Sequence, residues 1–175
     1  MNKKDTVVFD LDGTLLDTLE DLKNSVNYAM TQCGYPEHTL DEVRRYVGNG
    51  ILLLMQRAIP GGKDDPNFDK AFTLFKEHYG KHCNDTTKPY AGIMELLHTL
   101  KENNIKIAIV SNKADFAVKE LNAIYFKDLI PVAIGEKESE GIRKKPAPDT
   151  VIEALKQLGS TAENSVYIGD SDVDI

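Results

Sequence analysis

An apolar run that leads directly into two carboxylates constrains this chain more than any other stretch of its sequence. Val7–Phe9 are apolar, and Asp10, Asp12, Gly13 and Thr14 follow within five positions. A short apolar run that ends in turn residues is typical of a buried strand in a parallel sheet. Ligands of open α/β sheets bind beyond the carboxyl ends of such strands. We therefore expect the two aspartates to lie in a functional site.

Length and charge exclude several classes of protein. The 175 residues are enough for one domain with a modest insert. Folding at this length buries roughly 70% of the unfolded surface, so neither a metal nor a disulfide is needed for stability. The net charge of -7 argues against nucleic acid or an anionic membrane as the main partner.

The cysteines and the apolar runs favour a cytoplasmic protein. Cys33 and Cys83 form no metal-binding motif and are expected to be reduced thiols. The longest apolar runs are too short to span a bilayer, and no signal peptide is visible.

Strand and helix patterns alternate over most of the chain. Apolar residues at helical spacing lie between the later strands. The expected strands are Thr6–Asp10, Ile105–Val110, Pro131–Ile134 and Val166–Ile168. Strands that alternate with helices predict an α/β fold with a doubly wound parallel sheet, a Rossmann-like core.

Residues 17–85 interrupt this alternation with helical patterns alone. Thr39 and Glu42 have the spacing of a capping box, and Gly48–Gly50 separate two short helices. The sequence therefore predicts a small helical domain at 17–85, inserted into a core made of residues 1–16 and 86–175.

Polar residues follow three of the predicted strands. They are Asp10 and Asp12, Ser111 and Asn112, and Asp170. Since the carboxyl ends of parallel strands meet at one edge of a sheet, these side chains are expected to share one pocket. Lys145 is expected at the start of a helix beginning at Pro146, between the last two of these strands.

The three carboxylates have a chemistry that each alone would not indicate. A carboxylate such as Asp10 can act as a nucleophile, and Asp12 can act as general acid and base. Three clustered carboxylates repel one another unless a cation lies among them. Mg²⁺ is the expected cation, bound by the side chains of Asp10 and Asp170 and the main-chain carbonyl of Asp12, with Asp174 orienting the site from behind. Each carboxylate also has a purely structural alternative. Asp10 could cap the turn after its strand, Asp12 could be a residue of that turn, and the segment around Asp170 could be an acidic loop.

Cationic and hydroxyl groups are expected to hold a phosphate beside these carboxylates. Ser111 and Asn112 form a candidate anion site near a helix start, with a simple helix cap as the alternative. The hydroxyl of Thr14 is a further candidate substrate contact. Lys145 is the candidate partner of a phosphoryl oxygen, and Lys144 is its rival. Together these groups predict a phosphoryl-transfer site.

At this point the chain resembles the haloacid dehalogenase superfamily of phosphohydrolases. Four segments resemble the motifs of that family and occur in the same order, namely Asp10–Asp17, Ser111, Lys145–Asp149 and Gly169–Asp174. A looser resemblance of Arg45–Gly50 and Pro89–Gly92 points to its phosphoglycolate phosphatase branch.

The resemblance implies a role for each motif residue. Asp10 would be the nucleophile and Asp12 the general acid and base. Mg²⁺ would be held by Asp10, Asp12 and Asp170, and phosphate by Ser111 and Lys145. The helical insert would be a mobile cap that selects the substrate. A carboxylate at Asp12 points to phosphatases or phosphomutases, because dehalogenases of the superfamily lack it.

The resulting hypothesis is a Mg²⁺-dependent phosphatase of a small, phosphoglycolate-like monoester that works through an aspartyl phosphate. Two alternatives stay open. One is a sugar phosphomutase, which would return the phosphoryl group to the substrate. The other is an inactive binding domain, because the sequence ends at Ile175 where family members usually continue with a strand and a helix.

Overall fold

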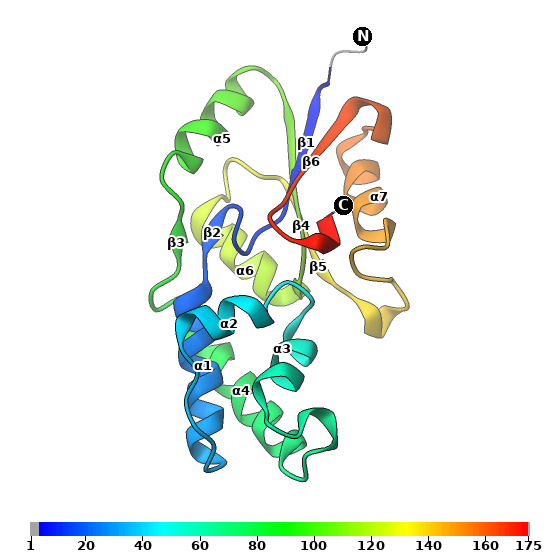
Figure 1. Cartoon of the computed structure of the whole chain (residues 1–175). Helices are drawn as coiled ribbons and strands as arrows, with labels where there is room; N and C mark the ends of the chain where they lie inside the picture. The colour runs from blue at the N-terminus through cyan, green and yellow to red at the C-terminus, as the bar shows by residue number, and fades with distance from the viewer. Residues whose placement is uncertain (1–3, 175) are drawn as a thin grey trace. The chain divides into compact units, whose positions relative to one another are not determined.

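The computed structural model describes residues 4–174, and the chain divides into two compact units (Figure 1). One unit is Met1–Leu16 with Pro89–Ile175, and the other is Asp17–Lys88. Residues 1–3 and 175, which the sequence assigns to the core, lie outside the described part. The second unit contains the segment 17–85 for which the sequence predicts an inserted helical domain.

Four parallel strands form the sheet of the first unit, in the order β5-β4-β1-β6. Their bounds are Thr6–Phe9 for β1, Lys106–Ala114 for β4, Val132–Glu136 for β5 and Ser165–Ile168 for β6. Phe9, the last residue of β1, pairs with Ile109 on one side and Ile168 on the other. The parallel α/β fold predicted from the alternating pattern is confirmed.

Helices cover both faces of this sheet (Figure 1). They are α5 (Ile93–Glu102), α6 (Asp115–Tyr125) and α7 (Asp149–Leu158). On one face, Phe9 and Ile109 pack in a cluster with Leu97 of α5 and Val118 of α6. On the other face, Val8, Ala108 and Val110 pack with Ala154 and Leu155 of α7. Since successive strand residues point to opposite faces, each strand of apolar residues contributes to two cores.

The second unit is helical. It consists of α1 (Leu19–Gln32), α2 (Leu40–Tyr46), α3 (Ile51–Ala58) and α4 (Phe68–His82) around an apolar cluster that includes Val26, Met30, Met55 and Phe75. Thr39 and Glu42 form the predicted capping box of α2. The side chain of each residue accepts a hydrogen bond from the main-chain N–H of the other. Such a cap satisfies two main-chain N–H groups that the first helical turn leaves without a partner.

Several short elements were not predicted from the sequence. Leu16–Asp17 (β2) and Lys88–Pro89 (β3) form a two-stranded sheet. Further single turns of 3₁₀-helix lie at Gly62–Asp64, Glu138–Glu140, Ala162–Asn164 and Asp172–Asp174. None of the helices in residues 4–174 combines the length and the apolar character that a bilayer span requires.

Two local predictions near the expected site were wrong. The helix expected from Pro146 begins at Asp149, so Lys145 lies in a loop and does not open α7. Strand β4 continues to Ala114 and does not end at Val110, with an irregular register in its last part. Ser111 and Asn112 therefore belong to the end of a buried strand, and the helix that follows begins at Asp115.

Candidate active site

The nucleophile candidate, Asp10, follows β1 directly and is 7% exposed. Its N–H donates to the carbonyl of Ile168 in β6 over 2.8 Å. Its carboxylate Oδ1 accepts from the N–H of Leu11 over 2.7 Å. Because β1 pairs in parallel with β6, the carboxylate of Asp10, near the start of the chain, lies close to Asp170, near the end of the chain.

Gly13 makes the approach of Asp170 sterically feasible. Its φ of +80° is a conformation that L side chains rarely adopt, and a Cβ built there would lie 2.2 Å from Oδ2 of Asp170. Only glycine fits both conditions. The Gly13 turn thus lets the Asp170 carboxylate lie against the backbone that follows Asp12.

Asp10, Asp170 and Asp174 each place a carboxylate oxygen within 4.8 Å of the other two. Burial raises the pKa of Asp10 to about 6, with further raising by the charges of Asp12 and Asp174 against the opposing effect of Lys145. Burial also raises the pKa of Asp170. Because the site disfavours negative charge on Asp10 and Asp170, and because all three carboxylates are hard oxygen donors, the group fits a divalent cation such as Mg²⁺.

Lys145 is the cation that faces these carboxylates. Its Nζ lies 3.1 Å from Oδ2 of Asp10 and 2.6 Å from Oδ1 of Asp174, and its side chain is 4% exposed. The hydroxyl of Tyr167 lies 2.9 Å from the same Nζ. Lys144, the rival in the sequence, instead pairs with Glu138 at 3.0 Å. The structure therefore brings Lys145, and not Lys144, to the carboxylates.

Asp174 is held by its own loop as well as by Lys145. The N–H and Oγ of Ser171 donate to Oδ2 of Asp174 over 3.0 and 2.8 Å. Burial opposes ionisation of this carboxyl, but the Lys145 and Ser171 contacts outweigh it and lower its pKa. The orienting role predicted for Asp174 stays a prediction. Asp172, two positions earlier, is exposed.

Asp12 lies apart from the three-carboxylate group and pairs with Lys113. The Nζ of Lys113 is 3.0 Å from Oδ1 and 3.3 Å from Oδ2 of Asp12, and the lysine side chain is 3% exposed. The carboxylates that the structure gathers are therefore those of Asp10, Asp170 and Asp174. A contribution of Asp12 to a metal would come from its main-chain carbonyl.

Three predicted substrate contacts, Ser111, Thr14 and Asn112, each have a different hydrogen-bond partner. Ser111 is buried, and its Oγ accepts from the N–H of Lys113 over 3.3 Å. Thr14 Oγ1 donates to Oδ1 of Asp170 over 3.3 Å. The amide of Asn112 bonds to the main chain of Lys145, with its Oδ1 accepting over 2.9 Å and its Nδ2 donating over 3.1 Å.

Sequence reasoning missed Lys113 and Tyr167. A lysine at the end of a predicted strand is ordinarily solvated, and its pairing with Asp12 depends on the register of β4 beside β1. Tyr167 lies between Val166 and Ile168 on β6, and both of these apolar residues are exposed in the structure. An apolar–tyrosine–apolar run does not indicate from the sequence that the tyrosine is the residue that faces inward.

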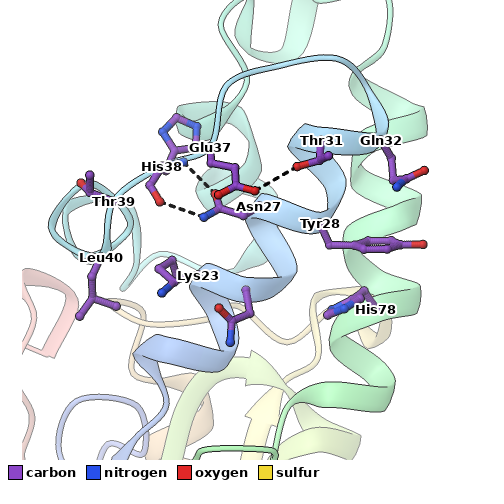
Figure 2. A pocket seen from close by; sticks show the side chains of 11 residues that line it. Lys23, Asn27, Tyr28, Thr31, Gln32, Glu37, His38, Thr39, Leu40 and His78 are labelled. Atoms are coloured by element: carbon purple, nitrogen blue, oxygen red, sulfur yellow. Dashed lines mark hydrogen bonds between the residues drawn. The ribbon is translucent and has the colours of Figure 1, made fainter.

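A cleft of about 540 Å³ lies within the second unit, between α1 and the segment that leads into α2 (Figure 2). Its central polar groups bond to each other. Asn27 Nδ2 donates to the carbonyl of His38 over 2.9 Å, and Asn27 Oδ1 accepts from the His38 N–H over 2.8 Å. These bonds fasten the segment before α2 to α1, and no site residue predicted from the sequence lines the cleft.

Comparison with known proteins identifies the family of this chain. The family model for haloacid dehalogenase-like hydrolases matches residues 7–175. A phosphoglycolate phosphatase of Aquifex aeolicus is 33% identical over 173 residues, covering 97% of this chain and 77% of that protein. One from Pseudomonas putida is 31% identical over 175 residues, covering 97% of this chain and 63% of that protein.

Solved structures give the same result. A protein from Lactobacillus delbrueckii, assigned as a phosphoglycolate phosphatase, superimposes with a TM-score of 0.88 at 34% identity. That match covers 98% of this chain and 80% of the other. The chain thus spans 63 to 80% of the length of these three proteins. Fold, motif order and relatives lead to one conclusion: the chain belongs to the haloacid dehalogenase-like hydrolase family, in its phosphatase branch.

Proposed function

We propose that the chain is a Mg²⁺-dependent phosphatase that hydrolyses a small phosphate monoester of the phosphoglycolate type through an aspartyl phosphate on Asp10. The placement of Lys145 against Asp10 and Asp174 supports this most directly, because it sets a buried ammonium beside the proposed nucleophile. The substrate class follows from relatives named phosphoglycolate phosphatase at 31 to 33% identity.

In the first step, a carboxylate oxygen of Asp10 attacks phosphorus and the bond to the ester oxygen breaks. That oxygen takes a proton from Asp12, and the alcohol leaves. In the second step, Asp12 takes a proton from a water whose oxygen attacks phosphorus, the bond between phosphorus and the Asp10 oxygen breaks, and phosphate leaves. Lys145, Ser111 and Thr14 are the proposed partners of the phosphoryl oxygens, whose charge such a site must stabilise.

Asp10 and Asp170 would hold the magnesium ion, together with the main-chain carbonyl of Asp12. Bound there, the ion would supply positive charge against the phosphoryl oxygens. Asp174 remains paired with Lys145 in this assignment and orients the ammonium.

A screen of small phosphate esters with Mg²⁺, including phosphoglycolate, tests the proposal through the release of free phosphate. Asp10→Asn should abolish turnover while the fold is retained, as judged by circular dichroism. Near-normal activity in that variant would overturn the nucleophile assignment. Formation of an isomeric sugar phosphate without free phosphate would instead identify a phosphomutase.

A further inference from the structure

Asn112 and Lys145 are joined by two buried hydrogen bonds between a side chain and a main chain. Asn112 Oδ1 accepts from the Lys145 N–H over 2.9 Å, and Nδ2 donates to the Lys145 carbonyl over 3.1 Å. The residues are 7% and 4% exposed, so each bond is shielded from water. A planar amide offers one acceptor and a donor pair side by side, which complements the two main-chain groups of a single residue.

These bonds fix a part of the chain that has no regular structure. Lys145 lies between the 3₁₀ turn at Glu138–Glu140 and α7, which begins at Asp149. Its neighbours are tied to partners near them in sequence: Arg143 to Asp149 and Lys144 to Glu138. Of residues 143–145, Lys145 is the one whose contacts reach the sheet. Its main chain is bonded to Asn112 in the last part of β4.

The position of the Lys145 backbone decides where its ammonium lies. A lysine side chain is flexible, with four carbons between the main chain and a compact charge. Here Nζ meets three groups, Asp10, Asp174 and the Tyr167 hydroxyl, within 3.1 Å. A shift of the main chain at residue 145 would move the ammonium away from at least one of them.

We propose that Asn112 is a positioning residue that acts through Lys145 and does not itself contact the phosphate ester. The inference rests on the proposed function, in which Lys145 balances the charge of the phosphoryl oxygens. It differs from the sequence prediction, which placed Asn112 among the substrate contacts. The reason is geometric, since both polar atoms of its amide are already directed at the main chain of Lys145.

A double-mutant cycle separates the two roles, with inorganic phosphate and Mg²⁺ as the probe and calorimetry of the full chain as the measurement. Asn112→Ala should weaken phosphate binding about 10-fold, and Lys145→Met should weaken it further. In the Lys145→Met background, Asn112→Ala should change the affinity less than about twofold, because contacting residues that act as a unit are not additive. If the two losses multiply, Asn112 touches the anion directly and the inference is wrong.

Asn122→Ala is the matched control for lost stability. Asn122 lies in the same unit, and its Nδ2 donates to the carbonyl of Ile130 over 3.2 Å. This variant also loses an asparagine that ties a side chain to a loop carbonyl. Its phosphate affinity should stay within about twofold of wild type. An equal loss in both asparagine variants would show a general effect on the fold and overturn the specific role.

A measurement without any ligand keeps the inference distinct from the proposed function. The side-chain ammonium of Lys145 can be followed by proton–nitrogen NMR, assigned with Lys145→Met. Its signal should shift or broaden in Asn112→Ala and stay unchanged in Asn122→Ala. An unchanged signal in Asn112→Ala contradicts the positioning role even in an active phosphatase. If wild type neither binds phosphate nor hydrolyses any ester, the proposed function fails, and the NMR comparison still decides the role of Asn112.

Discussion

Lys145 and Asp174 form a buried ion pair, with 2.6 Å between Nζ and Oδ1 and 4% of each side chain exposed. The same Nζ lies 3.1 Å from Asp10, and the carboxylate of Asp174 also accepts two bonds from Ser171. One buried cation thus joins a residue that follows β1 to a residue that follows β6. Such a pair holds its geometry because moving the two groups apart would leave an unpaired charge buried away from water.

Removal of this ammonium should cost much more stability than removal of its neighbour. Lys145→Met leaves Asp10 and Asp174 without their cation and should lower the free energy of unfolding by about 3 to 5 kcal/mol. Lys144→Met breaks a more exposed pair with Glu138 and should cost at most about 1 kcal/mol. Urea denaturation of both variants at pH 7 without Mg²⁺ measures the difference. Equal losses would contradict the burial-based assignment of the two lysines.

Asp10→Asn should stabilise the metal-free protein near neutral pH. The pKa of Asp10 is raised from 3.8 to about 6, chiefly by burial, so the folded state binds this proton more tightly than the unfolded state. Between about pH 4 and pH 6 wild type therefore loses stability as pH rises. Asparagine resembles the neutral acid, and the variant should be more stable by about 3 kcal/mol at pH 7, with little difference below pH 4.

Urea titrations in a chelator at several pH values test this prediction, and Mg²⁺ supplies the control. Addition of Mg²⁺ should stabilise wild type and leave Asp10→Asn nearly unchanged, because the variant lacks one anionic ligand. A variant less stable than wild type at pH 7 in chelator would show that the contact of ionised Asp10 with Lys145 outweighs its burial.

The sheet and the convergence of its strand ends could be predicted from the sequence, because short apolar runs that alternate with helical spacing indicate a parallel sheet. It identified Asp10, Lys145, Asp170 and Asp174, which the structure places together. It did not indicate Lys113 or Tyr167, because their partners are set by the lateral register of β4 and β6 beside β1. It placed the start of α7 too early because helical spacing alone does not show where the loop main chain is bound elsewhere, as at Lys145.

Asp21 should stabilise the second unit in a pH-dependent way. Its carboxylate accepts from the N–H and hydroxyl groups of Thr86 and Thr87 over 2.7 to 3.1 Å, which ties the segment before β3 to the first turn of α1. Burial opposes ionisation, but these bonds outweigh it and lower the pKa of Asp21 below 3.8. The stability that they provide is present above the ordinary carboxyl pKa and is lost as pH falls through the lowered value.

Asp21→Asn places an amide donor against these donors and should cost about 2 to 3 kcal/mol at pH 7. The difference from wild type should shrink below about pH 4, where the aspartate begins to be protonated. Asp41→Asn, at an exposed residue paired with Arg44, should cost less than about 1 kcal/mol. Acid titration of the free energy of unfolding measures both variants. A constant difference between wild type and Asp21→Asn down to pH 2 would contradict the prediction.

Gly13→Ala should reduce Mg²⁺ affinity and turnover through Asp170, beyond the cost of backbone strain. Gly13 and Gly34 both have positive φ, +80° and +76°, so alanine at either position is strained by about 1 kcal/mol. A Cβ at Gly13 would lie 2.2 Å from Asp170 Oδ2, whereas a Cβ at Gly34 meets nothing within 4 Å. Calorimetric titration with Mg²⁺ should therefore show at least about a 10-fold loss for Gly13→Ala and no change for Gly34→Ala, at similar losses of stability. Equal Mg²⁺ affinity in the two variants would mean that the Asp170 carboxylate does not bind the ion, since its displacement would then have no effect.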